Sequence, residues 1–213
     1  AKEIKEKLTL ARNRSSANIH FHIGATNSNH SNLVQIASQG CPEEGLKAED
    51  IAGIKVFMGS STGNMLVNDD ESLKELFSIK EKPILVHCED EDTIKRNLQA
   101  AKEKYGDDIP FEEHKNIRSR MACIKSTIQA LELAMKYQTR LVLCHISTME
   151  EVEMARAAKL NNPEIIAETS CNYLWFSDEA YSRLGSRIKC NPSVKSDSDR
   201  QALRNALRDG HID

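Results

Sequence analysis

Three polar side chains interrupt apolar runs that have the composition of buried strands. Lys55 lies inside GIKVFM, while His87 and His145 lie near the carboxyl ends of PILVHC and RLVLCHI. A lysine in such a run is costly to bury unless it is paired, modified or bound. Imidazole suits zinc, and a carboxylated lysine has two oxygens that can bridge two metal ions. The three residues predict metal-assisted hydrolysis, against the alternatives of a buried ion pair for Lys55 and hydrogen-bonded core positions for the histidines.

The elements that must position these side chains alternate between strands and helices. The spacing of apolar residues predicts five strands, at residues 18–24, 53–58, 83–88, 140–146 and 164–169. It predicts helices between and after them, at residues 70–80, 92–104, 119–137, 149–160 and 197–209, the last with Ser196 as N-cap and Gly210 as its end. Strands that alternate with helices favour an α/β fold with a parallel sheet. The carboxyl ends of such strands are where sites form.

The strand count leaves two α/β architectures open. Five strands suit an open doubly wound sheet, whereas a (β/α)8 barrel needs eight strands and about 250 residues. However, no GxGxxG or Walker loop follows any of the expected strands. Three of the runs are almost continuously apolar, which predicts strands that are covered on both faces. The final residues GHID resemble the beginning of another strand.

Composition excludes several classes of function. The chain has 213 residues and a net charge of −3, from 29 basic and 32 acidic side chains, so it lacks the basic excess expected for binding nucleic acid or an anionic membrane. No apolar run approaches the roughly 18 residues of a membrane helix, and the N-terminus lacks the apolar region of a secretory signal. The six cysteines form no CxxC pair and are expected to be reduced and mostly buried. These features predict a cytoplasmic protein.

The sequence gives weaker support to a functional role for the remaining candidate side chains. His20 and His22 share the spacing of a metal-binding HxH pair, although polar histidines on a strand face are the better interpretation. His114 lies in the polar stretch EEHKNIRSR and is expected at the surface. Asn191 precedes Pro192, so its amide could face a ligand or simply form a turn. His30 and His211 receive no role.

Four motifs together resemble one known family. In chain order, GIKVFMGSSTGNML, ILVHCEDED, LCHIST and KCNPSVK resemble dihydroorotases of the amidohydrolase superfamily. The resemblance extends over almost the whole chain and implies a partial TIM-type (β/α)8 barrel, about strands three to seven, with residues 1–213 as one incomplete catalytic domain. It implies that carboxylated Lys55 bridges two zinc ions, that His87 and His145 are zinc ligands, and that Asn191 contacts the substrate.

The resemblance also implies the reaction. Dihydroorotases catalyse the reversible cyclisation of N-carbamoyl-L-aspartate to dihydroorotate in de novo pyrimidine biosynthesis, and they are often homodimers. Hydantoinases (dihydropyrimidinases) tend to have serine, and allantoinases alanine, at the position of Asn191, so these relatives are less favoured alternatives. An alternative of another class is a non-catalytic, amidohydrolase-like module for binding or assembly.

The sequence departs from the family pattern at both ends. The first-strand HxH motif and the second-strand asparagine are absent, and His20 and His22 fall at the third strand, so the HxH role is not transferred to them. Asn172 stands where the seventh-strand motif usually has histidine. The catalytic aspartate, a general acid/base, is expected shortly after GHID. Residues 1–213 alone are therefore expected to be inactive and poorly soluble.

Overall fold

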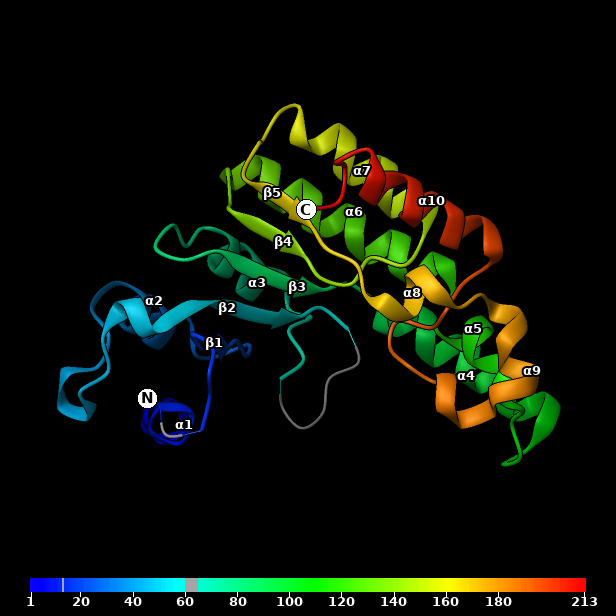
Figure 1. Cartoon of the computed structure of the whole chain (residues 1–213), viewed down its shortest axis with the longest axis horizontal. Helices are drawn as coiled ribbons and strands as arrows, with labels where there is room; N and C mark the ends of the chain where they lie inside the picture. The colour runs from blue at the N-terminus through cyan, green and yellow to red at the C-terminus, as the bar shows by residue number, and fades with distance from the viewer. Residues whose placement is uncertain (13, 60–64) are drawn as a thin grey trace.

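The sheet has five parallel strands in strictly consecutive order. The computed structural model describes residues 1–12, 14–59 and 65–213 (Figure 1). The strands are β1 (Phe21–Gly24), β2 (Ile51–Phe57), β3 (Ile84–His87), β4 (Leu141–Leu143) and β5 (Ile165–Ala167), in the order β1-β2-β3-β4-β5. A doubly wound sheet reverses its strand order at a switch point, whereas a barrel winds in one direction. The order therefore excludes the open doubly wound alternative and agrees with part of a barrel.

Ten α-helices are seen in the described residues. They are α1 (Lys2–Arg12), α2 (His30–Gln39), α3 (Asp70–Phe77), α4 (Glu91–Tyr105), α5 (His114–Ile117), α6 (Arg120–Tyr137), α7 (Met149–Lys159), α8 (Cys171–Trp175), α9 (Tyr181–Leu184) and α10 (Asp197–Arg208). Short 3-10 turns lie at Pro42–Glu44, Ala48–Asp50, Phe111–Glu113, Asp178–Ala180 and Gly185–Ile188. The five predicted strands and five predicted helices are confirmed within a few residues. Helices α1, α2, α5, α8 and α9 were not predicted.

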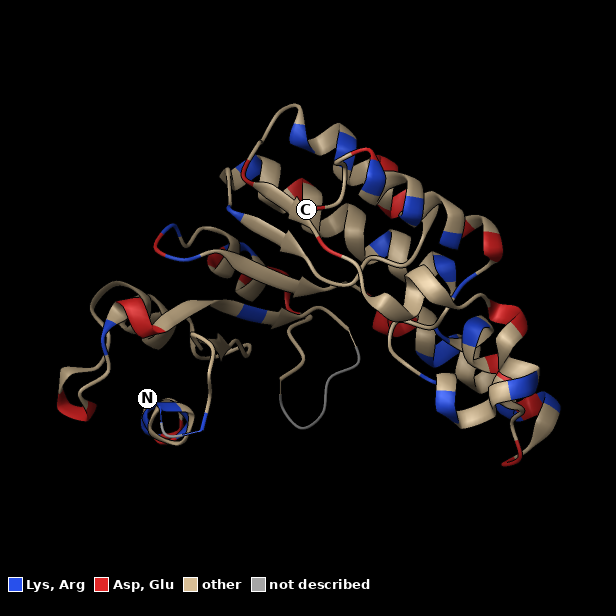
Figure 2. Ribbon diagram, viewed as in Figure 1, with Lys and Arg blue, Asp and Glu red and all other residues tan. Residues whose placement is uncertain are grey.

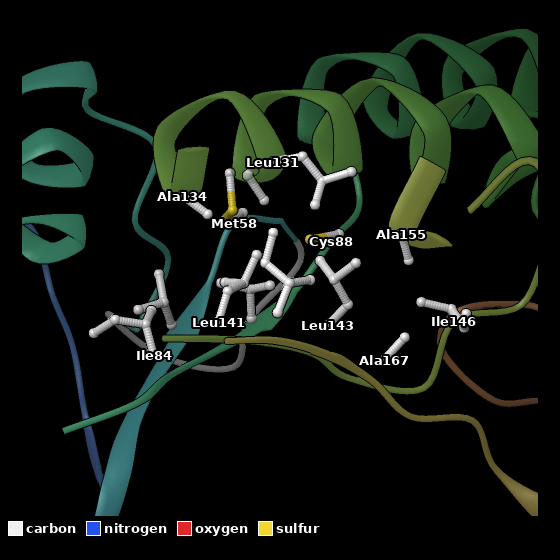
Figure 3. Packing of buried hydrophobic residues seen from close by; sticks show 14 of the residues in the cluster. Met58, Ile84, Cys88, Leu131, Ala134, Leu141, Leu143, Ile146, Ala155 and Ala167 are labelled. Carbon is white, nitrogen blue, oxygen red and sulfur yellow. The ribbon is translucent and has the colours of Figure 1, made fainter. Parts of the chain in front are cut away.

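The core lies between one face of the sheet and the helices. Leu131 and Ala134 of α6 pack over Leu141 and Leu143 of β4, as Figure 3 shows. All four side chains are buried. Helices α6, α7 and α10 run along this side of the sheet in Figure 1. The period-two alternation of the strands therefore directs one set of side chains into this core.

The opposite face of the sheet is open in the described part of the chain. Lys55, Leu85, Val142 and Ile166 are neighbours in register across β2 to β5. None of them is buried, and Ile166 is 41% exposed. The expectation that the strands are covered on both faces is therefore wrong for this structure, because helices cover only one side.

The ends of α10 agree with the predicted signals. The Ser196 side chain accepts a hydrogen bond from the Asp199 amide, and the Asp199 carboxylate accepts one from the Ser196 amide. This capping box satisfies amides that the first helical turn leaves unpaired. Gly210 follows the helix with a φ of +75°, a conformation that favours glycine. Asp213 then bonds through its amide to the Ala167 carbonyl at the edge of β5.

Charged side chains lie mainly on the solvent-facing sides of the helices and in the loops (Figure 2). This distribution is that of a helical layer packed on a sheet with its polar side in water. Within the ranges that the structure describes, no helix combines the length and the apolar character needed to cross a membrane.

Candidate metal centre

Two histidine rings meet at the carboxyl ends of neighbouring strands. His87 is the last residue of β3, and His145 lies two residues beyond β4. His87 Nδ1 lies 3.1 Å from His145 Nε2, and the rings are inclined by 73°. His145 has a φ of +41°, in the left-handed region that side chains rarely adopt. Such backbone strain is concentrated at functional positions, and here it accompanies the approach of the two rings.

Lys55 projects from β2 beside this pair. Its Nζ donates to the Cys144 sulfur at 3.2 Å and lies 5.2 Å from the centre of the Phe57 ring. Cys144 directly precedes His145, so the lysine lies close to the histidines. Lys55 forms no ion pair among the described residues. The described residues therefore give no support to the alternative of a buried ion pair at this position.

The buried carboxylate of Glu89 contacts the His87 ring on the side away from His145. Glu89 is fully buried and its Oε2 lies 2.8 Å from His87 Nε2. Burial alone would raise the pKa of Glu89, but the hydrogen bonds from His87 and Arg118 outweigh it and lower that pKa to about 2. Because an ionised carboxylate can only accept, His87 Nε2 is the donor in this contact, and Nδ1 is the ring nitrogen that faces His145. A carboxylate behind a histidine is a common second layer of metal sites.

His145 is held in its neutral form. Burial, together with the nearby His87 and Lys55, lowers the pKa of His145 to about 3. Its Nδ1 is buried and has no hydrogen-bond partner. Neutral imidazole is the form that binds metal. The charge state of His145 therefore suits a ligand.

The donor set fits a metal ion in part. Two nitrogens on one tetrahedral zinc ion lie about 3.3 Å apart, given bonds of about 2.0–2.1 Å. The His87–His145 separation of 3.1 Å is close to this value. In the part of the chain that the structure describes, no three or more His, Cys, Asp or Glu side chains gather into a metal site. The two imidazoles and Lys55 would thus supply part of a ligand set.

Asn191 lies in the turn that precedes α10. It is exposed, and the bond between it and Pro192 is a cis peptide. No hydrogen bond joins it to His87 or His145 among the described residues. Residues on both sides of Asn191 are nevertheless fixed, because the carbonyls of Cys190 and Pro192 accept hydrogen bonds from His114 and Tyr173, at 2.8 and 2.7 Å. The structure therefore holds the turn that presents the Asn191 amide.

Two of the weaker sequence predictions are wrong. His114 is only 8% exposed and its Nε2 donates to the Cys190 carbonyl, so it lies inside the molecule and not at the surface. Only half of the six cysteines are buried, although most were expected to be, and Cys171 is exposed at the beginning of α8. All six cysteines are free thiols, and Cys88, Cys123 and Cys144 are buried.

The other candidates lie at the edge of the sheet, on α8, or outside the described residues. His20 Nδ1 contacts the Glu49 carbonyl at 3.2 Å, and both His20 and His22 are exposed. Partial desolvation of its ring, then the proximity of Lys55, lowers the pKa of His22. Asn172 is exposed on α8. The part of the GIKVFMGSSTGNML motif at residues 60–64 lies outside the described residues.

Sequence reasoning missed Glu89 and Arg118. They are 29 residues apart, yet Arg118 Nε lies 3.1 Å from both carboxylate oxygens of Glu89. The one available signal was a glutamate two positions after His87, directly after the apolar run PILVHC, where a buried acidic side chain needs a partner. Nothing in the sequence identifies Arg118 as that partner.

Two solved structures have a fold similar to that of this chain. The fold matches an L-hydantoinase (dihydropyrimidinase) from Arthrobacter aurescens with a TM-score of 0.83 and 22% identity, over 99% of this chain and 45% of the hydantoinase. It matches a dihydroorotase from Campylobacter jejuni with a TM-score of 0.59 and 15% identity, over 99% of this chain and 54% of that protein. The chain therefore shares the fold of about half of each of these proteins, which confirms the predicted partial (β/α)8 barrel.

Sequence comparison identifies similar proteins more narrowly than comparison of folds does. No protein-family model matches the chain. However, a dihydroorotase from Methanosarcina acetivorans is 31% identical over 221 aligned residues, which cover 100% of this chain and 44% of that enzyme. The resemblance to dihydroorotases that the motifs predicted is thus confirmed. The chain spans less than half the length of this relative.

Proposed function

We propose that this chain forms the metal-binding part of a zinc-dependent dihydroorotase, which interconverts N-carbamoyl-L-aspartate and dihydroorotate in pyrimidine biosynthesis. The observation that carries the proposal is the approach of His87 Nδ1 to His145 Nε2 beside Lys55, in a chain similar to dihydroorotases over its whole length. The six free thiols suit a reducing compartment, and we infer that the enzyme acts in the cytoplasm.

The protein's own residues prepare the ligands. Glu89 keeps the proton of His87 on Nε2, so the Nδ1 lone pair is available. Burial keeps His145 neutral. Carboxylated Lys55 would add two oxygens able to bridge a pair of zinc ions. When bound, such a zinc pair would lower the pKa of a shared water and polarise the amide carbonyl of the substrate.

Asn191 is the residue we propose for substrate binding. Its side chain is exposed and makes no hydrogen bond within the ranges that the structure describes, so both its amide donors and its carbonyl acceptor are open to a cyclic amide. Asparagine at this position supports dihydroorotase, because hydantoinases tend to have serine there and allantoinases alanine.

A second candidate is a hydantoinase or dihydropyrimidinase. The observation that favours it is the fold, which is more similar to the Arthrobacter hydantoinase than to the Campylobacter dihydroorotase. Both candidates hydrolyse a cyclic amide, so the ligands proposed above would serve either reaction. The side chains that contact the substrate must distinguish them.

The test is a substrate panel with the native full-length protein. Zinc-loaded enzyme is assayed with dihydroorotate, dihydrouracil, hydantoin and allantoin, and Asn191→Ser provides the matched variant. Dihydroorotate is expected to have the highest kcat/KM, and Asn191→Ser should lower it without loss of zinc. A preference for hydantoin or dihydrouracil would favour the second candidate. The absence of turnover with all four compounds would favour a non-catalytic module.

A further inference from the structure

We propose that one short segment, α5 together with Arg118, positions both the metal-binding His87 and the substrate-binding Asn191. This inference rests on the proposed function and deepens it, because it assigns positioning residues to the two halves of the same site. The segment comprises residues 114–118, follows α4 and precedes α6 in the chain, and lies beside α4 in Figure 1.

On the metal side of the site, Arg118 holds Glu89, and Glu89 holds His87. Arg118 is 8% exposed and forms a forked ion pair with Glu89, which is fully buried. Glu89 in turn accepts the hydrogen bond from His87 Nε2. A planar guanidinium fixes the plane of a carboxylate more firmly than a single ammonium would. Arg118 therefore sets the position of Glu89, and Glu89 sets the ring orientation and the tautomer of His87.

The second half concerns the turn that carries Asn191. The main-chain carbonyl of Arg118 accepts a hydrogen bond of 2.8 Å from the buried Ser193 hydroxyl. His114 Nε2 donates to the Cys190 carbonyl, also at 2.8 Å. These two contacts lie on either side of Asn191, and both come from the same short segment. They fix the backbone on which the exposed asparagine side chain is mounted.

The segment is rigid enough to link the two sides. The Arg118 amide donates to the His114 carbonyl at 2.9 Å, which closes one helical turn. Asn97 of α4 donates to the carbonyls of Asn116 and Ile117, at 3.0 and 3.1 Å, and so attaches the turn to its neighbour. A displacement of this turn would move the support of His87 and the support of Asn191 together.

The metal side is tested by metal affinity in the absence of substrate. Native full-length protein, freed of metal, is titrated with Co²⁺ in competition with a chelator, and the visible absorption reports the coordination. Arg118→Gln should weaken Co²⁺ binding about 10–100-fold, the usual effect of losing an outer-layer partner. Arg118→Lys keeps the charge and should recover part of the affinity. If Arg118→Gln does not fold, the Co²⁺ affinity of Arg118→Lys is compared with that of the native protein instead.

The matched control is Arg120→Gln. Arg120 lies two residues further on and pairs with Glu150 and Asp199, away from the histidines. Thermal melting confirms that each variant is folded at the temperature of the titration. Folded Arg118 variants that bind Co²⁺ within twofold of the Arg120→Gln control would overturn the proposal.

The substrate side is tested by steady-state kinetics at saturating metal. His114→Phe keeps the size of the ring and removes the donor to Cys190, so KM should rise about fivefold, the effect of one lost hydrogen bond, while kcat changes less. An unchanged KM, or an equal rise in Arg120→Gln, would contradict the proposal. The proposed function fails separately, if native protein binds no Co²⁺ or does not turn over dihydroorotate.

Discussion

Two buried glutamates are expected to give the stability of the protein opposite dependences on pH. Glu89 has a pKa of about 2 in the folded chain, against an ordinary value of 4.5, because hydrogen bonds from His87 and Arg118 outweigh the effect of burial. At about 1.4 kcal/mol per pH unit, the difference corresponds to roughly 3 kcal/mol of folding free energy. The unfolded chain binds the proton first as the pH falls. This stabilisation is therefore complete above pH 4.5 and is lost between pH 4.5 and about 2.

Glu151 provides the contrasting case. It is buried at the beginning of α7 and accepts hydrogen bonds from neutral donors, among them the Ser147 and Thr148 amides. Burial raises the pKa of Glu151 despite these bonds. The folded chain now binds the proton first, so this group destabilises the protein at neutral pH. Its contribution becomes more favourable as the pH falls towards its raised pKa.

The assay is urea unfolding of the metal-free full-length protein between pH 7 and pH 3. From pH 5 to pH 3 the native protein should lose about 2 kcal/mol through Glu89. Glu89→Gln should remove that loss, although it begins less stable because Arg118 is left buried without its partner. Glu151→Gln should leave the loss in place or enlarge it. Equal pH slopes in native protein and in Glu89→Gln would refute the reasoning.

Three further predictions concern the core, the thiols and the isolated chain. Leu141→Ala should lower the free energy of unfolding by about 2–5 kcal/mol, because the Leu141 side chain is fully buried between the sheet and α6. Leu160 is 86% exposed, so Leu160→Ala should change the free energy of unfolding by less than about 0.5 kcal/mol in the same denaturation experiment. Cys171 should be the first thiol to react with a chromogenic disulfide reagent, since burial raises the pKa of Cys88; persistence of the fast phase in Cys171→Ser would contradict this. Residues 1–213 on their own should show no turnover of dihydroorotate, because the proposed ligands form only part of a metal site; detectable turnover would disprove this.

The sequence predicted the parts of the site that depend on local pattern. His87 and His145 were identified because each ends an apolar run, and the carboxyl ends of parallel strands meet at one edge of a sheet. The structure brings their nitrogens to 3.1 Å. Lys55 was identified because a charged group inside a buried strand is expensive. These inferences required only the period of the strands and their parallel arrangement.

The supporting contacts could not be read from the sequence. The pairing of Arg118 with Glu89 and of His114 with the Cys190 carbonyl depends on how the helices that follow β3 pack in three dimensions. His114 was assigned to the surface because its neighbours in the chain are polar, yet its ring turns inward. The open face of the sheet was missed for a related reason, since an apolar run shows that a strand is suited to burial and does not show what covers it.

The most direct test of the account is anomalous diffraction at the zinc edge from crystals of the native full-length protein. The account predicts a zinc peak between His87 Nδ1 and His145 Nε2, a second zinc ion nearby, and added density on Lys55 Nζ from its carboxylation. Zinc bound elsewhere, or unmodified Lys55 with no peak between the two histidines, would contradict the central claim that these three residues hold the metal.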